Sequence, residues 1–527
     1  MHYSYKLTTF ALMLGIIATT ATADVSSVRV SISKNKTITL NLSNSITNIT
    51  TPQIRIPAQP ANGTATAVSC ADDTLRCITY QPNTDYVGID TFNYEVTNDA
   101  DATESADVTI NVGGVTPNTQ GTTSNEALEG ALNDICLNNA GGELTDLCAA
   151  FSTAVETGAG KDLRELLDAL SPQSVSSQGT LNNELIKEQL ANISKRLTAL
   201  RKGQQKTVLS GLTLQLNGET ITGTMFDTLF AANASGGSAG SADGFNKKWD
   251  WYISGKVGGG EQNETDFESG FEFDTNNITT GADMRLGNLA TVGAALGYST
   301  AEMDINNNAG GMEIDGLSAT LYGSYYPSDN TYFDAILNVG TNSFKMDRRI
   351  IFGMTDVTAN SDADSTSFAL SIGGGYDYVI SGGLTASFSG RFDYIDTAID
   401  GYAESDGGGY EVVIQGQDIS QLLSSVSAQL SYATSLSWGV LLPHVNVSWL
   451  HQFDDKANKV EGYFLADSSQ TLFSFDANTP DSDYFVTALG ASAIFAGGKS
   501  AFIQYETSLA QENLETWNVS AGLRLEF

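Results

Sequence analysis

The residue types that most often carry acid–base or nucleophilic chemistry are scarce in this chain. Three histidines occur among 527 residues, and two of them, His444 and His451, lie near the C-terminus. Residues 3–443 therefore offer no histidine to activate a serine or cysteine nucleophile. The sequence also contains no H-E-x-x-H zinc motif and no P-loop. Carboxylates are plentiful, but none stands in an apolar run that would tune it as an acid or base. We therefore expect no enzyme activity and no cofactor.

The four cysteines fall into two close pairs, Cys70 with Cys77 and Cys136 with Cys148. A metal site built on them would need four converging soft ligands or histidines, and this region has no histidine. An exported chain reaches an oxidising compartment, where closely spaced cysteines form disulfides. We therefore expect two local disulfides and no metal.

Four carboxylates near the first cysteine pair are candidates for a calcium site, namely Asp85, Asp90, Asp99 and Asp101. Calcium is bound by carboxylate and carbonyl oxygens, often in a compact D-x-D-x-D-G loop. These four residues form no such loop. We favour the alternative that they are solvated carboxylates in turns.

The elements that hold these residues are mostly strands, and the last of them is the clearest. From residue 517 to residue 527 apolar and polar residues alternate strictly. One face carries Trp517, Val519, Ala521, Leu523, Leu525 and Phe527, and the other carries Asn518, Ser520, Gly522, Arg524 and Glu526. A strand with one apolar and one polar face suits a barrel wall with lipid outside and water inside.

The same alternation recurs through residues 249–527, always with serine, threonine, asparagine, glutamine or charged residues on the polar face. Short turns such as RLGNL and PSDNT alternate with longer acidic segments such as MDINNNAGGMEID and RRIIFGMTDVTANSDADS. Short turns at one end and long loops at the other are typical of bacterial outer-membrane barrels. We predict twelve antiparallel transmembrane strands around a wet lumen, with His444 facing the lumen and His451 at the rim.

The composition and the N-terminus agree with export. The formal net charge is −35, which excludes nucleic acid as a partner because phosphate binding needs clustered lysine and arginine. Residues 1–23 have the features of a secretory signal peptide: Lys6, an apolar core over residues 10–18, and a small-x-small cleavage site at residues 21–23. No other stretch has 18 uninterrupted apolar residues, so insertion into a membrane would be as a barrel.

Two further regions precede the barrel. Residues 24–115 contain six short runs typical of strands, which predict an immunoglobulin-like β-sandwich. Residues 116–248 form a linker that contains helices, a hairpin with the sequence LTLQLNGETITG and a flexible glycine- and serine-rich tract. The longest helical pattern covers residues 181–202 and would be about 33 Å long. It is a candidate pore helix, although a surface or coiled-coil helix would show the same pattern.

The first of these regions resembles the bacterial cadherin-like, Ig-like repeats of surface proteins. The resemblance covers residues 60–112 and follows the spacing Y-x-P-N-x-x-Y-x-G-x-D-x-F-x-Y-x-V. It is carried by Gly63, Thr64, Tyr80, Pro82, Asn83, Tyr86, Gly88, Asp90, Phe92, Tyr94, Val96 and Asn98. Related modules sometimes hold calcium, but the resemblance identifies no ligand.

The C-terminal region resembles the translocator domain of classical autotransporters, through WYISGKVGGG, TTGADMRLGN, VGAALGYS, LPHVNVSWLHQF and NVSAGLRLEF. The cysteine pair, the LSP and the RLTAL of residues 131–203 resemble the segment that precedes the barrel in that family. The resemblance implies a barrel assembled by the outer-membrane insertion machinery. It also implies that the last strand is the assembly signal, with Trp517, Val519, Leu523, Leu525 and Phe527 as its apolar residues.

These observations predict an all-β membrane protein in the outer membrane of a Gram-negative bacterium, with a small Ig-like sandwich and a helical linker before a twelve-stranded barrel. We expect the barrel to contact outer-membrane lipid and lipopolysaccharide. We expect the sandwich to be displayed at the cell surface for adhesion or another interaction with an extracellular protein or glycan. The alternative is a structural barrel or pore whose N-terminal domain stays in the periplasm.

Overall fold

The computed structural model describes most of the chain after residue 23. The described residues are 24–32, 34–43, 45–47, 53–70, 76–97, 103–112, 123–138, 144–157, 160–202, 213–216, 219–222, 249–453, 457–495 and 499–526. The predicted signal peptide, Asp99, Asp101 and Phe527 lie outside these ranges. The chain divides into two compact units, one built on the N-terminal β-sandwich and one on the barrel.

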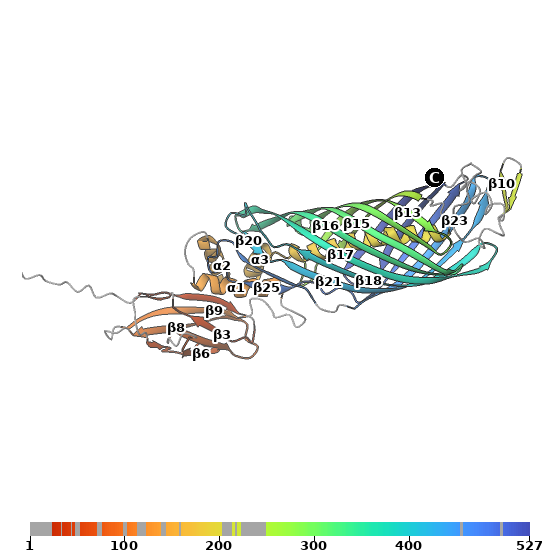
Figure 1. Cartoon of the computed structure of the whole chain (residues 1–527). Coiled ribbons are helices and arrows are strands. Elements are labelled where there is room, and N and C mark those ends of the chain that lie inside the picture. The colour runs from red at the N-terminus through yellow and green to blue at the C-terminus, as the bar shows by residue number, and fades with distance from the viewer. Residues whose placement is uncertain are drawn as a thin grey trace, which may run out of the picture. The chain divides into compact units, whose positions relative to one another are not determined.

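The N-terminal unit contains two facing sheets (Figure 1). One sheet has the order β2 (Val28–Ile32), β9 (Thr103–Val112), β8 (Gly88–Thr97) and β5 (Gln53–Arg55), and the other has β3 (Ile38–Asn41), β7 (Cys77–Pro82) and β6 (Gly63–Val68). Strand β2 pairs with β9 in parallel, and the other neighbours pair antiparallel. A short pair of β1 (Asp24–Val25) and β4 (Ile46–Thr47) completes the described strands. The predicted Ig-like sandwich is therefore confirmed.

Alternation along β8 builds the sandwich core. Phe92, Tyr94 and Val96 point inward and are buried, and the ring of Phe92 stacks on that of Tyr80 at a centroid distance of 6.2 Å. The hydroxyl of Tyr80 donates a hydrogen bond to Asp90 Oδ2 at 2.8 Å, and burial raises the pKa of Tyr80. Asp90 is 2% exposed and also accepts a hydrogen bond from the backbone of Asn62 at 3.0 Å. Two donors therefore stabilise one buried carboxylate.

Replacing Tyr80 by phenylalanine is expected to destabilise the sandwich by about 1–3 kcal/mol, because a buried carboxylate loses a donor. Tyr86→Phe is the matched control, since its hydroxyl donates to the carbonyl oxygen of Ile89 at an exposed site, at 2.7 Å. The control should cost about 0.5 kcal/mol or less. Urea unfolding of residues 24–115, which contain their own hydrophobic core, measures both changes. Equal losses for the two variants would contradict the role given to Asp90.

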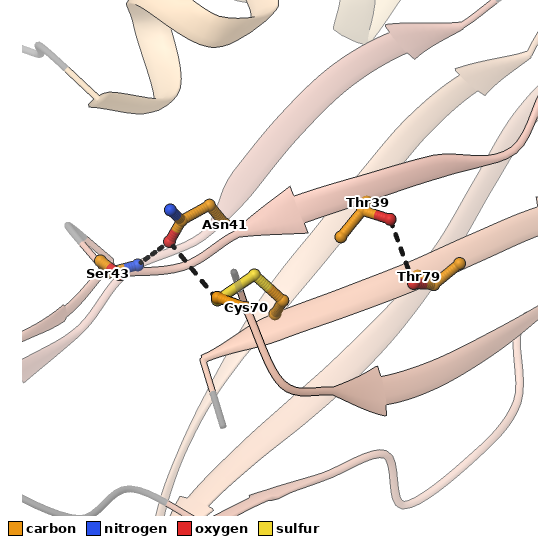
Figure 2. Close-up of a disulfide and its surroundings, with 6 residues drawn as sticks. Thr39, Asn41, Ser43, Cys70 and Thr79 are labelled. Carbon is orange, nitrogen blue, oxygen red and sulfur yellow. Dashed lines mark hydrogen bonds between the residues drawn. A yellow bond between two sulfur atoms is a disulfide. The ribbon is translucent and has the colours of Figure 1, made fainter. Parts of the chain in front are cut away.

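A disulfide joins Cys70 to Cys77, between the end of β6 and the start of β7, with a Cα–Cα distance of 5.3 Å (Figure 2). Beside it the Thr39 and Thr79 hydroxyls meet across β3 and β7 at 3.2 Å. The other two cysteines, Cys136 and Cys148, are also disulfide-bonded.

Thirteen strands are hydrogen-bonded in the large sheet, and twelve of them form the wall of a closed barrel. The thirteenth, the short β22 (Thr434–Leu436), follows β21 and pairs antiparallel with the start of β23. The twelve are β12 (Trp249–Gln262), β13 (Phe271–Leu286), β14 (Ala290–Ile305), β15 (Gly310–Ser328), β16 (Thr331–Phe352), β17 (Thr355–Ser381), β18 (Leu384–Ile399), β21 (Gln417–Tyr432), β23 (Gly439–Gln452), β26 (Asp483–Phe495), β27 (Lys499–Leu509) and β28 (Leu514–Glu526). All neighbours are antiparallel, and β12 pairs with β28 to close the barrel. The predicted twelve-stranded barrel is confirmed.

Side chains alternate between the two faces of the wall as the sequence predicted. On β15, Leu317 and Leu321 are 65% and 61% exposed on the outer face, whereas Thr320 between them is 2% exposed and faces inward. On β28, Leu523 is 60% exposed and Ser520 is buried. An apolar outer face and a polar inner face are the pattern of a barrel in lipid.

The connections divide the barrel into two ends. We call the end with the connections 287–289, 329–330 and 382–383 the turn end, and the end with residues 400–416 and 453–482 the loop end. Two predicted long loops are instead mostly strand. Residues 348–365 continue β16 and β17, because Gly353 adopts a positive φ of 56° and allows a tight hairpin turn. Likewise β14 and β15 are separated by only residues 306–309.

The two long connections at the loop end fold into a small antiparallel sheet that the sequence reading missed. Its order is β19 (Tyr402–Ala403), β20 (Val412–Ile414), β24 (Lys459–Phe464) and β25 (Phe473–Asp476). The side chains of Val412, Phe464, Phe473 and Phe475 are at most 1% exposed. The loop end is therefore a packed structure with an apolar core of its own.

Between β9 and β10 the chain forms four described helices, α1 (Ser124–Asn138), α2 (Thr145–Thr157), α3 (Gly160–Leu170) and α4 (Ser174–Lys202). The hairpin β10 (Thr213–Leu216) with β11 (Glu219–Thr222) is present as predicted. Helix α4 begins at residue 174 rather than at the predicted 181, because burial of Val175, Ser176 and Ser177 stabilises a turn that has weak helix propensity. No helix among the described residues is both long enough and apolar enough to cross a membrane.

Candidate functional site: the helix in the barrel lumen

Helix α4 lies inside the barrel, where the strands surround it (the yellow ribbon in Figure 1). Its side chains bond to several strands of the wall. Asn182 Nδ2 donates to Thr397 Oγ1 of β18 at 3.1 Å, and Asn192 Nδ2 donates to Asn277 Oδ1 of β13 at 2.8 Å. The candidate pore helix of the sequence is therefore the segment that occupies the lumen in this structure.

The apolar stripe of α4 packs against an apolar patch on the inner wall. Its members Ile186, Leu190, Ile193, Leu197 and Leu200 are at most 5% exposed. They form one cluster with Tyr252, Ala295, Tyr322, Ile336, Ala369, Ile395 and Leu423 of the barrel. The lumen was predicted to be wet throughout, and this half of it is instead a packed core. The sequence pattern did not show this, because the apolar inner residues are isolated among polar ones.

The first part of α4 is bonded to the loop end of the barrel. Asn182 Oδ1 accepts hydrogen bonds from Asn342 of β16 and, at 3.1 Å, from Ser365 of β17. Gln178, one turn earlier, donates to the hydroxyl of Tyr402 at 3.0 Å. Thr397 lies near the loop end of β18, and Tyr402 belongs to β19 in the loop-end sheet, so α4 begins there.

The last part of α4 is held at the turn end by two buried ion pairs. Arg196 Nε donates to Asp283 Oδ2 at 2.7 Å, and its guanidinium lies 4.5 Å from the ring centroid of Tyr252. Arg201 Nη1 donates to Asp334 Oδ2 at 2.7 Å, and its guanidinium lies 3.6 Å from the ring of Tyr332. The four charged side chains are at most 9% exposed. Because Arg196 and Arg201 are five residues apart on a helix with 3.6 residues per turn, they point in different directions, and the two pairs together restrain the height and the rotation of α4.

The middle of α4 carries further charges that face the wall. Lys195 Nζ lies 3.4 Å from Glu506 of β27, and Glu188 Oε1 lies 3.4 Å from Lys256 of β12. Each charge that α4 brings into the lumen here has an opposite charge within reach. Such pairing offsets much of the free energy lost by removing the charges from water.

One side of α4 faces open space instead of a packed wall. Cavities of about 260 Å³ and 220 Å³ lie between the helix and strands that include β21, β23 and β27. They share several lining residues, among them Ser194, Arg391, Ser427 and Glu506, so they adjoin one another. A third cavity of about 80 Å³ nearer the loop end shares Glu184, Lys187 and Tyr484 with the first. The lining is mixed in charge and rich in serine.

The loop end also holds the segment before α4. The guanidinium of Arg348 donates two hydrogen bonds to the Glu404 carboxylate, at 2.8 and 2.6 Å. It also donates to the carbonyl oxygens of Leu170 and Tyr410, at 3.1 and 3.0 Å. Arg348 and Glu404 are each 6% exposed. The C-terminal end of α3 is therefore bonded to the barrel at the loop end.

Of the four calcium candidates the structure describes only Asp85 and Asp90, which lie in different environments. Asp90 is engaged inside the sandwich, and Asp85 lies at the surface, where its carboxylate is 3.2 Å from Lys34. The pKa of Asp85 is lowered mainly by its hydrogen bond with the Asn35 side chain, and also by the nearby Lys34. Among the described residues no group of three or more histidine, cysteine or acidic side chains could hold a metal ion.

The two histidines lie as predicted. His444 lines the cavity inside the barrel, and its Nε2 lies 3.2 Å from Gln504 Oε1. His451 lies at the loop end of β23, exposed, with its Nδ1 3.0 Å from Asp483.

The proposed assembly-signal residues are only partly described. Trp517 and Leu523 are 42% and 60% exposed on the outer face, and Val519 is partly exposed there. The side chains of Leu525 and Phe527 lie outside the described residues. The role of this strand in assembly remains a prediction from the family resemblance.

The sequence did not identify the ion pairs that hold α4. A signal for them exists. Arg196 and Arg201 are charges in the last turns of a helix whose other face is apolar, and Asp283 and Asp334 lie on inner faces next to short turns. If the helix is placed inside the barrel, its arginines lie at the same end of the lumen as these aspartates, and ion pairs between them can be predicted.

Comparison with protein families agrees with this architecture. Residues 251–506 match the family described as the autotransporter β-domain, and residues 18–111 match the family described as a bacterial Ig domain. No curated protein sequence matches the chain.

Several solved structures are similar to the barrel. The translocator domain of the autotransporter NalP from Neisseria meningitidis is 16% identical, with a TM-score of 0.43, over 58% of this chain and 95% of that one. The β-domain of the Bordetella autotransporter BrkA is 16% identical, with a TM-score of 0.41, over 54% and 100% of the two chains. The transport unit of AIDA-I from Escherichia coli is 15% identical, with a TM-score of 0.35, over 57% and 97%.

Proposed function

We propose that this chain, which joins a bacterial Ig domain to an autotransporter β-barrel of the outer membrane, displays the Ig-like sandwich at the cell surface. The sandwich would bind a protein or glycan outside the cell, as an adhesion or interaction module. The barrel would be an anchor in lipid and lipopolysaccharide, placed there by the outer-membrane insertion machinery. No enzymatic step is part of the proposal.

The direction of α4 is the observation that supports display. The helix begins at the loop end, near Thr397, and ends at the turn end, near Asp334. In outer-membrane barrels the long loops face the outside and the short turns face the periplasm. The chain before residue 174 therefore leaves the lumen at the outer side, and residues 24–112 precede that point in the same chain.

Protease treatment of intact cells tests display. An epitope inserted next to residue 24 should be lost within minutes, while an epitope in the turn at 329–330 should survive until the outer membrane is permeabilised. A periplasmic protein of the same cells, followed in parallel, controls for leakage. Survival of the first epitope on intact cells would contradict display and favour a periplasmic sandwich.

A second candidate function is a narrow pore, and the cavities beside α4 favour it. They adjoin one another along one side of the helix and are lined by serine and by charges of both signs. Such a path suits water and small ions, because the serines and charged residues of its lining offer polar partners beside apolar residues such as Leu190 and Leu450. Purified full-length protein in planar bilayers should give small, steady currents if the path is continuous. No current at any voltage would contradict this function while leaving display untouched.

A further inference from the structure

The segment that connects β12 to β13, residues 263–270, bridges two parts of the loop end. Ser269 Oγ donates to Gln173 Oε1 at 2.9 Å, directly before α4 begins. Thr265 Oγ1 donates to Asn478 Oδ1 at 2.8 Å, in the connection that leads to β26. The start of the lumen helix and the last long loop are therefore joined through one short segment.

Glu268 is the central residue of this bridge, and it is 1% exposed. Its Oε2 accepts a hydrogen bond from Asn478 Nδ2 at 2.9 Å. Ser177, in the first turn of α4, also lies beside the carboxylate, and its side chain lowers the pKa of Glu268. The side chain also lines the cavity of about 80 Å³ at the loop end of the lumen. The sequence alone did not single out Glu268, because its side chain is buried by segments that are distant in the chain.

The charged and titratable groups around the site do not neutralise Glu268. Glu184 and Lys187 of α4 are paired with each other at 2.8 Å. Asp481, in the connection before β26, and Tyr484, in β26, line the same cavity. Glu512 lies in the sequence between two further lining residues, just before β28. Glu264 and Asp266 belong to the same segment as Glu268. Among these groups only Lys187 is cationic, and no ion pair with Glu268 forms among the described residues. An ionised Glu268 is therefore a buried anion without a cation.

We propose that residues 263–270 form a pH-sensitive latch, in which protonated Glu268 holds the start of α4 against the 477–482 connection and ionised Glu268 releases it. The latch would regulate the path beside α4, so its effect on current rests on the proposed pore function. Its effect on the structure of the loop end is independent of that function.

The direction of the pH effect follows from burial. Burial raises the pKa of Glu268 to about 7, against the opposing effects of the Asn478 and Ser177 side chains. Once the segment opens to water, the pKa returns to about 4.3. The closed arrangement is then fully favoured below about pH 4.3 and loses stability as the pH rises through about 7. Between pH 5 and pH 8 the closing equilibrium should weaken on the order of 50-fold.

Hydrogen–deuterium exchange of the full-length protein in lipid vesicles tests the latch. After correction for intrinsic exchange, peptides covering residues 263–270 and 477–482 should lose protection at pH 8 relative to pH 5. Glu268→Gln should keep protection at both values, because it stays neutral. Glu264→Gln, on the same segment, is the matched control and should behave like the unmodified protein. Equal protection at the two pH values, or the same pH response in Glu268→Gln, would overturn the proposal.

Current measurements on the same samples separate the latch from the pore. If ions pass, the current should rise between pH 5 and pH 8 and stay low in Glu268→Gln. If no current appears at either pH but the change in protection persists, the pore function fails and the latch stands. A current that rises equally in Glu268→Gln would count against the latch.

Discussion

Neutralising Asp283 and Asp334 together is expected to release the C-terminal part of α4 and to turn a nearly closed barrel into an open one. Asp283→Asn and Asp334→Asn leave Arg196 and Arg201 buried without a counterion. Removing one partner of a buried pair costs about 3–5 kcal/mol. Because the two pairs lie on different strands and share no partner, the costs should nearly add.

At about 3 kcal/mol for each pair, the population of barrels with a displaced helix would rise roughly 10⁴-fold. Planar-bilayer recordings of the double variant should show large, steady openings that the unmodified protein lacks. Asp315→Asn is the matched control. Asp315 also lies on a barrel strand, but it is on the outer face, where it accepts a hydrogen bond from Tyr298 at 2.7 Å. If the control and the double variant conduct alike, the ion pairs do not hold the helix.

A charge on the lipid-facing wall is expected to have the second largest effect. Leu321→Arg places a guanidinium on the outer face near the middle of β15, where Leu321 is 61% exposed. At the centre of a bilayer such a substitution destabilises an outer-membrane barrel by about 2–4 kcal/mol. The chain offers a matched control in Leu289, which is 60% exposed but lies in a connection at the turn end. Leu289→Arg should cost about 0–1 kcal/mol.

Urea unfolding of the barrel in phospholipid vesicles, followed by tryptophan fluorescence, measures both variants. A larger loss for Leu321→Arg supports the assignment of β15 residues 317–325 to the membrane. The reverse order, or equal losses, would mean that the apolar outer face has another environment.

The wall of the barrel was predictable because its signal repeats. Alternation with period two indicates each strand. The face on which leucine, valine or an aromatic residue recurs, as at Leu317 and Leu321, is predicted to face lipid. The end of a strand is harder to predict. The residues from Arg348 to Phe352 look like a loop by composition, but pairing with residues 355–359 keeps them in β16.

The candidate site was less predictable, because its parts come from distant segments. Arg196 and Asp283 are 87 residues apart and become partners only after the barrel closes around the helix. In the sequence, Glu268 cannot be distinguished from an exposed acidic residue, because its hydrogen-bond partner Asn478 is 210 residues away. The small sheet of β19, β20, β24 and β25 similarly needs two loops that are far apart in the chain.

The bond between Cys70 and Cys77 has a consequence for passage through the barrel. The two cysteines are seven positions apart in the sequence, so the disulfide closes a small ring, and their Cα atoms lie 5.3 Å apart, close to the spacing of about 4.8 Å between adjacent strands. The lumen holds a helix, which is about 10–12 Å wide with its side chains. A hairpin closed by this ring therefore has a cross-section close to that of the helix. On the display proposal, oxidation and threading need no fixed order, since the ring adds little width to the moving chain.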